Sequence, residues 1–153
     1  MAAPDEPKAQ SASGTSVATS TTMLLIAAGR SAQRRFESAL AEQKLTMRHI
    51  GALGHLAHSP GLSYSDLARR AHVTPQSMHA TMTQLVELGA VVTENRGRAS
   101  HARLTARGVE LLAFVADTAG ACDASFGIAD DVAPQLRDEL KKIAMQAFTA
   151  GES

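Results

Sequence analysis

Apolar side chains recur every three or four residues along most of the chain, and this spacing predicts a mainly helical protein. One long helix is expected over residues 21–45, where an apolar stripe follows one face. A second helix is expected over 47–58 with Thr46 as its N-cap, because a threonine side chain can accept a hydrogen bond from the first turn. The same periodicity predicts a last helix over about 131–148.

Two short helices joined by a tight turn are predicted in the middle of the chain. Ser63 opens the first of them in the sequence S-Y-S-D, which has the form of a capping box. Thr74 and Pro75 open the second at the N-cap and the first helical position, where proline costs no hydrogen bond. This helix is expected to continue to Leu88, with Gly89 as its C-cap glycine.

A β-hairpin is predicted next, with strands over 90–94 and 101–104 joined by a polar turn over 95–100. Thr105 is expected to cap a further helix that continues to about residue 125. Two helices joined by a turn and followed by a hairpin form a winged helix-turn-helix. In that arrangement the second helix enters the DNA major groove, and the hairpin contacts the backbone or the minor groove. The expected fold class is therefore mainly α with a small β-hairpin wing.

Composition separates a tail from a single domain. Residues 1–20 are rich in Ala, Ser, Thr and Pro with almost no large apolar side chain, so they are expected to be disordered. Residues 21–149 suit one domain with a real core, because 44% of the chain is hydrophobic. Within it the winged helix-turn-helix is expected over about 46–104, between flanking helices over about 21–45 and 105–149.

The formal net charge of zero conceals an uneven distribution of charge. Residues 62–108 carry six arginines against three acidic residues, whereas residues 109–153 carry three cations against eight acidic residues. A basic middle segment can face the phosphates of a nucleic acid while an acidic end faces away or pairs with another subunit. The distribution therefore favours a nucleic-acid partner that the net charge alone does not suggest.

The second of the two middle helices lies in a segment without cations, since no lysine or arginine occurs from Ala71 to Asn95. Neutral side chains can still read base edges: glutamine suits adenine, serine and threonine suit either partner, and alanine contacts the thymine methyl group. Gln84 is expected to be exposed on this helix as well. The residues expected to contact bases are Gln76, Ser77, His79, Ala80 and Thr83.

Contacts to phosphates, which set affinity and position a protein on DNA, are assigned to residues around that helix. The arginines expected in this role end the preceding helix or lie in and beside the wing. Two N-cap residues join them, because unpaired N–H groups at a helix N-terminus favour a phosphate. The full set is Ser63, Arg69, Arg70, Thr74, Arg96, Arg98 and Arg103.

Metal binding and catalysis have little support in the sequence. His55 and His58 have a spacing compatible with shared metal ligation, but no cysteine lies nearby, so ordinary helix histidines are favoured and no metal or cofactor is predicted. Cys122 has Asp123 beside it and no cation near it in sequence, which favours an inert thiol over a redox switch. No phosphate loop or nucleophile elbow occurs, and the protein is not expected to be an enzyme.

The cysteine content favours a reducing compartment and the hydropathy argues against a membrane span, so the cytoplasm is the expected location. A single cysteine excludes an internal disulfide framework. The apolar run at 23–28 is too short to span a bilayer, which takes about 20 apolar residues. Only Lys8 supplies positive charge before that run, so neither a membrane association nor a secretory signal is predicted.

Five short motifs occur in a fixed order between residues 45 and 108. They are L-T-x-x-x-I-x-x-L-x-x-L-A (45–57), G-L-S-x-x-D-L-A (61–68), V-T-P-x-S-M (73–78), L-x-x-L-G-A-V (85–91) and R-x-x-x-x-x-L-T-x-x-G (98–108). Each motif alone is shared by many winged helices, whereas the ordered set resembles the multiple antibiotic resistance regulator (MarR) family. With the flanking helices, the resemblance covers about residues 21–148.

The resemblance implies a sequence-specific transcriptional regulator, more often a repressor, that forms a homodimer through its first, fifth and sixth helices. It further implies binding to a pseudo-palindromic double-stranded DNA operator and, as in many members, release by a small aromatic or anionic effector. The effector pocket would lie between the dimer helices and the winged domain. The polar residues that could face it are Arg30, Arg34, His49 and His55.

Three departures from the family pattern affect the wing and the second of the two middle helices, which we call the reading helix because it is expected to contact bases. Arg96 stands two residues before Arg98 where the family usually has an acid, so the usual wing ion pair is expected to be absent. The hairpin is also shorter than the common form, and Ala80 and Gln84 stand where many members carry a basic residue. These departures leave open an alternative, a helical interaction module that does not bind DNA, such as an antirepressor or a dimerising scaffold.

Overall fold

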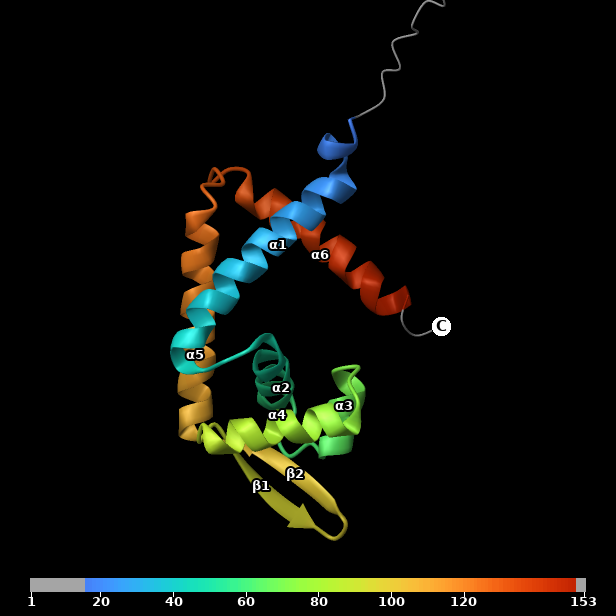
Figure 1. The fold of residues 1–153 in the computed structure, drawn as a ribbon, viewed down its shortest axis with the longest axis vertical. Coiled ribbons are helices and arrows are strands. Elements are labelled where there is room, and N and C mark those ends of the chain that lie inside the picture. The colour runs from blue at the N-terminus through green and yellow to red at the C-terminus, as the bar shows by residue number, and fades with distance from the viewer. Residues whose placement is uncertain (1–15, 151–153) are drawn as a thin grey trace, which may run out of the picture. The chain divides into compact units, whose positions relative to one another are not determined.

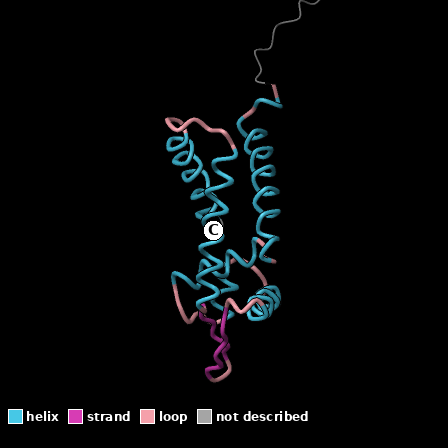
Figure 2. Tube along the Cα trace, turned by 90° about the vertical axis from the view of Figure 1, so that its left-hand side faces the viewer, coloured by secondary structure: helices cyan, strands magenta, loops and turns pink. Residues whose placement is uncertain are grey.

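The computed structural model describes the chain from residue 16 to residue 150, with side chains as far as residue 146. The expected fold class is confirmed, and β1 and β2 are the only strands in the described part of the chain (Figure 1, Figure 2). The elements in order are η1 (Val17–Thr19), α1 (Thr21–Leu40), η2 (Ala41–Gln43), α2 (Met47–His58), α3 (Tyr64–Arg70), α4 (Pro75–Glu87), β1 (Val91–Arg96), β2 (Ala99–Leu104), α5 (Ala106–Ser125) and α6 (Ala133–Ala150).

The chain divides into two compact units, residues 1–34 and 35–153. The first unit contains η1 and the larger part of α1. Residues 1–15 of the predicted tail lie outside the described residues, whereas Val17–Thr19 form a 3-10 turn. The end of α1 and all later elements belong to the second unit, which holds the winged helix-turn-helix.

The helix predicted over 21–45 ends earlier, at Leu40. The backbone tightens into η2, and Lys44 then takes a left-handed conformation with φ 57°. The Leu45 N–H donates to the Leu40 carbonyl oxygen over 3.1 Å, and both leucine side chains are buried. The predicted end was wrong because Leu45 keeps the apolar spacing of the helix although its backbone has already left it.

Side-chain caps begin the later helices at the predicted positions. The hydroxyl groups that accept a hydrogen bond from the N–H three residues further on are those of Thr46, Ser63, Thr74 and Thr105. In α2 the capping box is complete, because the Thr46 N–H donates to Nδ1 of His49 over 3.1 Å. Gly89 follows α4 with φ 71°, as expected of a C-cap glycine.

The hairpin has a shorter turn than the sequence predicts. Both strands continue through the segment expected to be a turn, so that Arg96 pairs with Ala99 and only Gly97 and Arg98 connect them. Gly97 has φ 64°, and a glycine with positive φ at the first central position is typical of a type II′ hairpin turn. The polar residues suggested a loop because the outer part of the hairpin is exposed on both faces.

The core of the second unit joins the end of α1 to α2, α3, α4, the base of the hairpin and α5. Its fully buried large side chains are Leu40, Leu53, Leu56, Leu67, Met82, Leu85, Val91 and Leu111. Gly108 in α5 lies directly against this base, and a Cβ there would overlap the carbonyl oxygen of Ala90. That same oxygen accepts the Thr105 N–H over 3.0 Å, so the L-T-x-x-G motif marks the place where α5 meets the hairpin.

Helix α6 presents an apolar face that the rest of its own unit leaves exposed. The residues predicted to form its stripe include Val132, Leu136, Leu140 and Ile143, each between 38% and 46% exposed. The fifth member of the predicted stripe, Ala147, has a side chain outside the described residues. Among the described residues, no helix combines the length and the hydropathy needed to cross a membrane.

Candidate nucleic-acid interface

The outer face of α4 is a neutral surface. Gln76, Ala80 and Thr83 are exposed along it, as the sequence predicts. His79 is exposed at one side, where its ring meets the Tyr64 ring edge-on with centroids 5.8 Å apart. The Thr83 hydroxyl donates to the His79 carbonyl oxygen over 3.0 Å, which leaves its lone pairs and its methyl group facing outward.

Ser77 differs from the other residues expected to contact bases. Its side chain is half-buried, and its hydroxyl oxygen accepts a hydrogen bond from the Thr74 hydroxyl over 3.0 Å. Thr74 in turn accepts the Ser77 N–H as the N-cap of α4. Both hydroxyl groups are therefore engaged in beginning the helix, and a phosphate at this end would meet α4 through its N-terminal N–H groups.

The arginines of α3 and the hairpin belong to the same unit as this neutral face. Arg69 pairs with Asp66 on α3, and Arg103 pairs with Glu94 across the hairpin. Arg98 at the hairpin turn is exposed and has no acidic partner among the described residues. Arg98 lines a hollow of about 280 Å³ together with the start of α3 and the start of α4. Other residues that line it are Ser63, Tyr64, Pro75, His79 and Ser100.

The usual ion pair between an acid at position 96 and Arg98 is absent among the described residues, as expected, but the wing carries other ion pairs that the sequence did not predict. Glu94 in β1 binds Arg103 and also Arg96, whose guanidinium lies 3.3 Å from Oε2. The Arg103 charge, followed by the hydrogen bond from Arg96, lowers the pKa of the Glu94 carboxyl below its ordinary value. The acid lies two residues before the family's position, on the same strand as Arg96, and the pairing of the two strands brings it near Arg103.

Tyr64 is a residue of this surface that sequence reasoning missed. Its hydroxyl lies 2.7 Å from the Thr93 hydroxyl of β1, and its ring contacts His79 of α4. One side chain at the start of α3 therefore links the hairpin to the reading helix. The signal available in the sequence was that Tyr64 is the single tyrosine of a chain with 3% aromatic residues.

Arg70 lies in different surroundings from Arg69. It donates to the Ser59 hydroxyl over 3.0 Å and lines a second pocket of about 410 Å³ between α2, the α3–α4 turn and α4. Three more basic side chains line that pocket, Arg48, His55 and His72, and its apolar side includes Met78. The pocket therefore combines positive charge with an apolar wall.

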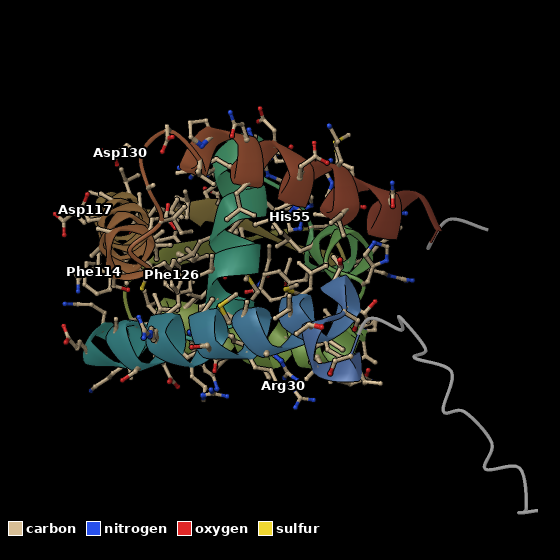
Figure 3. The ribbon with its side chains drawn as sticks, turned by 90° about the horizontal axis from the view of Figure 1, so that it is seen from above. Arg30, His55, Phe114, Asp117, Phe126 and Asp130 are labelled. Carbon is tan, nitrogen blue, oxygen red and sulfur yellow. The ribbon has the colours of Figure 1, made fainter. Side chains whose placement is uncertain are left out.

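His55 lines this pocket, and its role as a residue that could face a ligand stays a prediction. Figure 3 labels its position on α2. Burial lowers the pKa of His55, and the charges of Arg70 and then His58 lower it further. The ring is therefore disposed to be neutral until an anion offsets the surrounding positive charge.

His49 lines neither of the two pockets described above, and its burial argues against the predicted role of facing a ligand. Its side chain is only 3% exposed, and both ring nitrogens have partners within the chain. Nδ1 accepts the Thr46 N–H, and Nε2 lies 2.7 Å from Oε1 of Gln84 on α4. The N3 position in a capping box was the local signal for burial of this polar group.

The remaining candidates are two arginines and a histidine pair. Arg30 and Arg34 are exposed on α1 in the N-terminal unit, so they stay predictions. The His58 side chain contacts the backbone of its own helix, with Nδ1 3.0 Å from the Gly54 carbonyl oxygen. No group of three His, Cys, Asp or Glu side chains that could hold a metal ion occurs among the residues the structure describes.

The order of elements, the capped reading helix and the flanking hairpin define a winged helix-turn-helix protein. The sequence model of the MarR family matches residues 43–99. The HTH-type transcriptional repressor Rv2887 of Mycobacterium tuberculosis is 37% identical over 118 residues, which cover 75% of this chain and 84% of that protein. The chain therefore belongs to the MarR family.

Solved structures agree with this assignment. The crystal structure of the M. tuberculosis MarR family protein Rv2887 in complex with DNA has a TM-score of 0.70 at 32% identity, and the match covers 81% of this chain and 97% of that chain. The same protein in complex with salicylic acid gives a TM-score of 0.63 at 32% identity, covering 81% and 96%. A crystal structure of MarR itself, at 21% identity and a TM-score of 0.74, shows the shared fold.

Proposed function

We propose that the protein is a homodimeric transcriptional repressor that binds a pseudo-palindromic DNA operator through α4 and the wing. The observation that carries this proposal is a neutral exposed face on α4 with arginines on both α3 and the hairpin. Neutral side chains suit base edges in the major groove, and arginines suit the phosphates beside it. The DNA complex of the related Rv2887 protein supports DNA as the partner.

The two kinds of contact fall to different residues. Gln76, His79, Ala80 and Thr83 contact bases from the exposed face of α4, whereas Ser77 acts chiefly in the helix cap. The phosphate contacts come from α3, the N-terminus of α4 and the hairpin. This set comprises Arg69, Arg96, Arg98 and Arg103, with Ser63 and Thr74 as the caps that orient the helix N-termini.

Dimerisation supplies the symmetry that a pseudo-palindromic operator requires. The exposed apolar face of α6 would be covered by a second copy, since an apolar stripe of this length is rarely left in water. In a two-fold dimer the two α4 helices would meet half-sites about 34–36 Å apart, which is one turn of DNA. The acidic residues of the C-terminal third are separate in the sequence from the helices that we propose to bind DNA.

A small anionic aromatic molecule is the effector we propose, bound in the pocket between α2 and α4. Arg48, His55 and Arg70 would neutralise its acid group, and Met78 would contact its ring. The complexes of the related Rv2887 protein with salicylic acid and p-aminosalicylic acid support this chemical class. Because Ser77 and Met78 of α4 line the pocket, occupancy would act directly on the reading helix.

We also propose that the protein has a regulatory role rather than a catalytic one, because its relatives are named as transcriptional repressors. A repressor acts where the chromosome lies, so we propose the cytoplasm as the location of the protein. The regulatory role and the location both depend on the DNA-binding role.

Selection of bound fragments from genomic DNA, followed by two substitutions, tests the proposal. On a recovered duplex, Arg98→Ala should weaken binding to all DNA sequences alike, whereas Gln76→Ala should relax preference at one base pair at a cost of about 1–3 kcal/mol. If neither change alters binding, this docking is wrong. If a folded dimer recovers no fragment at low salt, the interaction module without DNA binding is the better description.

A further inference from the structure

Gln84, on the flank of α4, is joined to the buried ring of His49 on α2. Nε2 of His49 lies 2.7 Å from Oε1 of Gln84. His49 is 3% exposed, whereas Gln84 is exposed one helical turn after Ala80. This contact crosses between two helices and is not needed to begin either of them.

The hydrogen-bond partners of His49 determine where its proton lies. A backbone N–H can only donate, so Nδ1, which receives the Thr46 N–H over 3.1 Å, carries no hydrogen. A neutral imidazole then has its hydrogen on Nε2, and Nε2 must be the donor toward Gln84. The atom of Gln84 that faces His49 must therefore be its oxygen.

This arrangement orients the Gln84 amide in one way. The oxygen is turned inward to His49, and the amide nitrogen is directed away from it with two hydrogens to donate. That nitrogen has no partner among the described residues, although it belongs to the helix that carries the neutral reading face. A glutamine fixed in this way offers donors only, unlike Gln76, which can offer both a donor and an acceptor.

We infer that Gln84 is a further DNA-contacting residue and that buried His49 is its positioning residue, so that α4 presents a fixed hydrogen-bond donor to an acceptor on DNA. The inference rests on the proposed DNA-binding function. The acceptor is a phosphate oxygen or the O6 or N7 atom of guanine, because a donor-only amide cannot make the paired contact to adenine. Fixing the side chain in advance lowers the entropy cost of the contact.

The test compares full-length variants on a duplex that the wild-type protein binds, with affinity measured by fluorescence anisotropy. Gln84→Ala should weaken binding about tenfold, the size expected of one hydrogen bond to a charged or strongly polar acceptor. His49→Gln retains a residue favoured at N3 of a capping box but withdraws the ring from Gln84. It should weaken binding several-fold in the presence of Gln84 and have no further effect in the Gln84→Ala background.

Controls separate this inference from the proposed function. Val86→Ala, an exposed position on the same helix outside the interface, should bind as the wild type does, and thermal melts should show that each variant is folded. A uniform loss on all duplexes identifies a phosphate as the acceptor, and a loss confined to duplexes with one guanine identifies that base.

Three results would overturn the inference. One is unchanged binding by Gln84→Ala while Arg98→Ala weakens binding, which leaves the proposed function standing. Another is an effect of His49→Gln that is equally large with and without Gln84. The third is the absence of DNA binding by the wild type, which removes the proposed function and this inference together.

Discussion

At the scale of single side chains, the proposed DNA interface has one set of residues for contacts to bases and another for contacts to phosphates. The exposed face of α4 carries no cation, and the arginines proposed to contact phosphates belong to α3 and to a hairpin with a two-residue turn. Some of these arginines already have acidic partners within the chain, so their availability to phosphates depends on carboxylates that compete for them.

Replacing Glu94 by glutamine should strengthen DNA binding. The Glu94 carboxylate binds Arg96 and Arg103 on the exposed surface of the hairpin, and removing its charge frees both guanidinium groups for phosphates. We expect the dissociation constant to fall on the order of 3- to 10-fold at low salt. Glu87→Gln makes the same charge change at an exposed position of α4 away from the arginines and should have a smaller effect. Weaker binding by Glu94→Gln would mean that the ion pairs are needed to shape the wing.

His55 should make the protein less stable as the solution becomes acidic. The fold lowers its pKa from the ordinary value of 6.5, so the unfolded chain takes up a proton that the folded chain resists. The free energy of unfolding contributed by this group is therefore present above about pH 6.5 and is lost as the pH falls toward the lowered pKa. Urea denaturation across this range should show a smaller loss for His55→Gln than for the wild type. Equal losses would contradict the assignment.

The sequence predicted the exposed face of α4 from spacing alone, because outward positions on a helix follow from its period. It could not predict the two partners of His49. The N3 position of a capping box is local and readable, whereas Gln84 lies 35 residues away and meets the ring only through packing of α2 against α4. The ion pair between Glu94 and Arg103 was missed for the same reason, since it depends on the register of the two strands.

At the scale of elements, the junction of α5 with the hairpin leaves no room for a side chain at Gly108. Gly108→Ala should destabilise the protein by about 1–3 kcal/mol, because the new methyl group would overlap the Ala90 carbonyl oxygen. Gly120→Ala on the same helix has open space around it and should be neutral or stabilising by up to about 1 kcal/mol. Urea denaturation measures both, and an equally stable Gly108→Ala variant would contradict the close approach.

Helix starts were predictable because each depends on one residue and the three that follow it, as at Thr46, Ser63, Thr74 and Thr105. Element ends that depend on backbone conformation were not. Lys44 adopts a left-handed conformation that is not expected of a lysine, and α1 ends earlier than predicted. The hairpin turn was overestimated because an exposed two-stranded ribbon has the same polar composition as a loop.

At the scale of the whole molecule, the exposed apolar face of α6 should be the part of the protein that holds a dimer together. Ile143→Glu places a charge in this face, where Ile143 is 45% exposed in the single chain, and should yield monomers in sedimentation velocity. Lys141→Glu changes charge at a position outside the apolar stripe and should stay dimeric. Dimers that survive Ile143→Glu would place the interface elsewhere.

Sequence periodicity predicted this face, but neither the sequence nor the single chain defines the surface that covers it. An amphipathic stripe indicates that a helix packs against an apolar neighbour, but it does not identify that neighbour. For α2 and α4 that neighbour is the core of their own unit, whereas the apolar face of α6 is left exposed by its unit, and we propose that a second copy covers it. The sequence likewise does not identify the effector or the operator, because both are separate molecules that bind the chain.

The central claim is that a dimer binds DNA with arginines contacting phosphates, and the salt dependence of DNA binding tests it most directly. Affinity of the wild-type dimer for a duplex recovered from genomic DNA should fall steeply as salt rises, with a slope of about −7 in a plot of log affinity against log salt concentration if four arginines per subunit meet phosphates. An unrelated duplex should bind more weakly under the same conditions. A folded dimer that binds neither duplex at low salt, or whose affinity does not change with salt, would contradict the account.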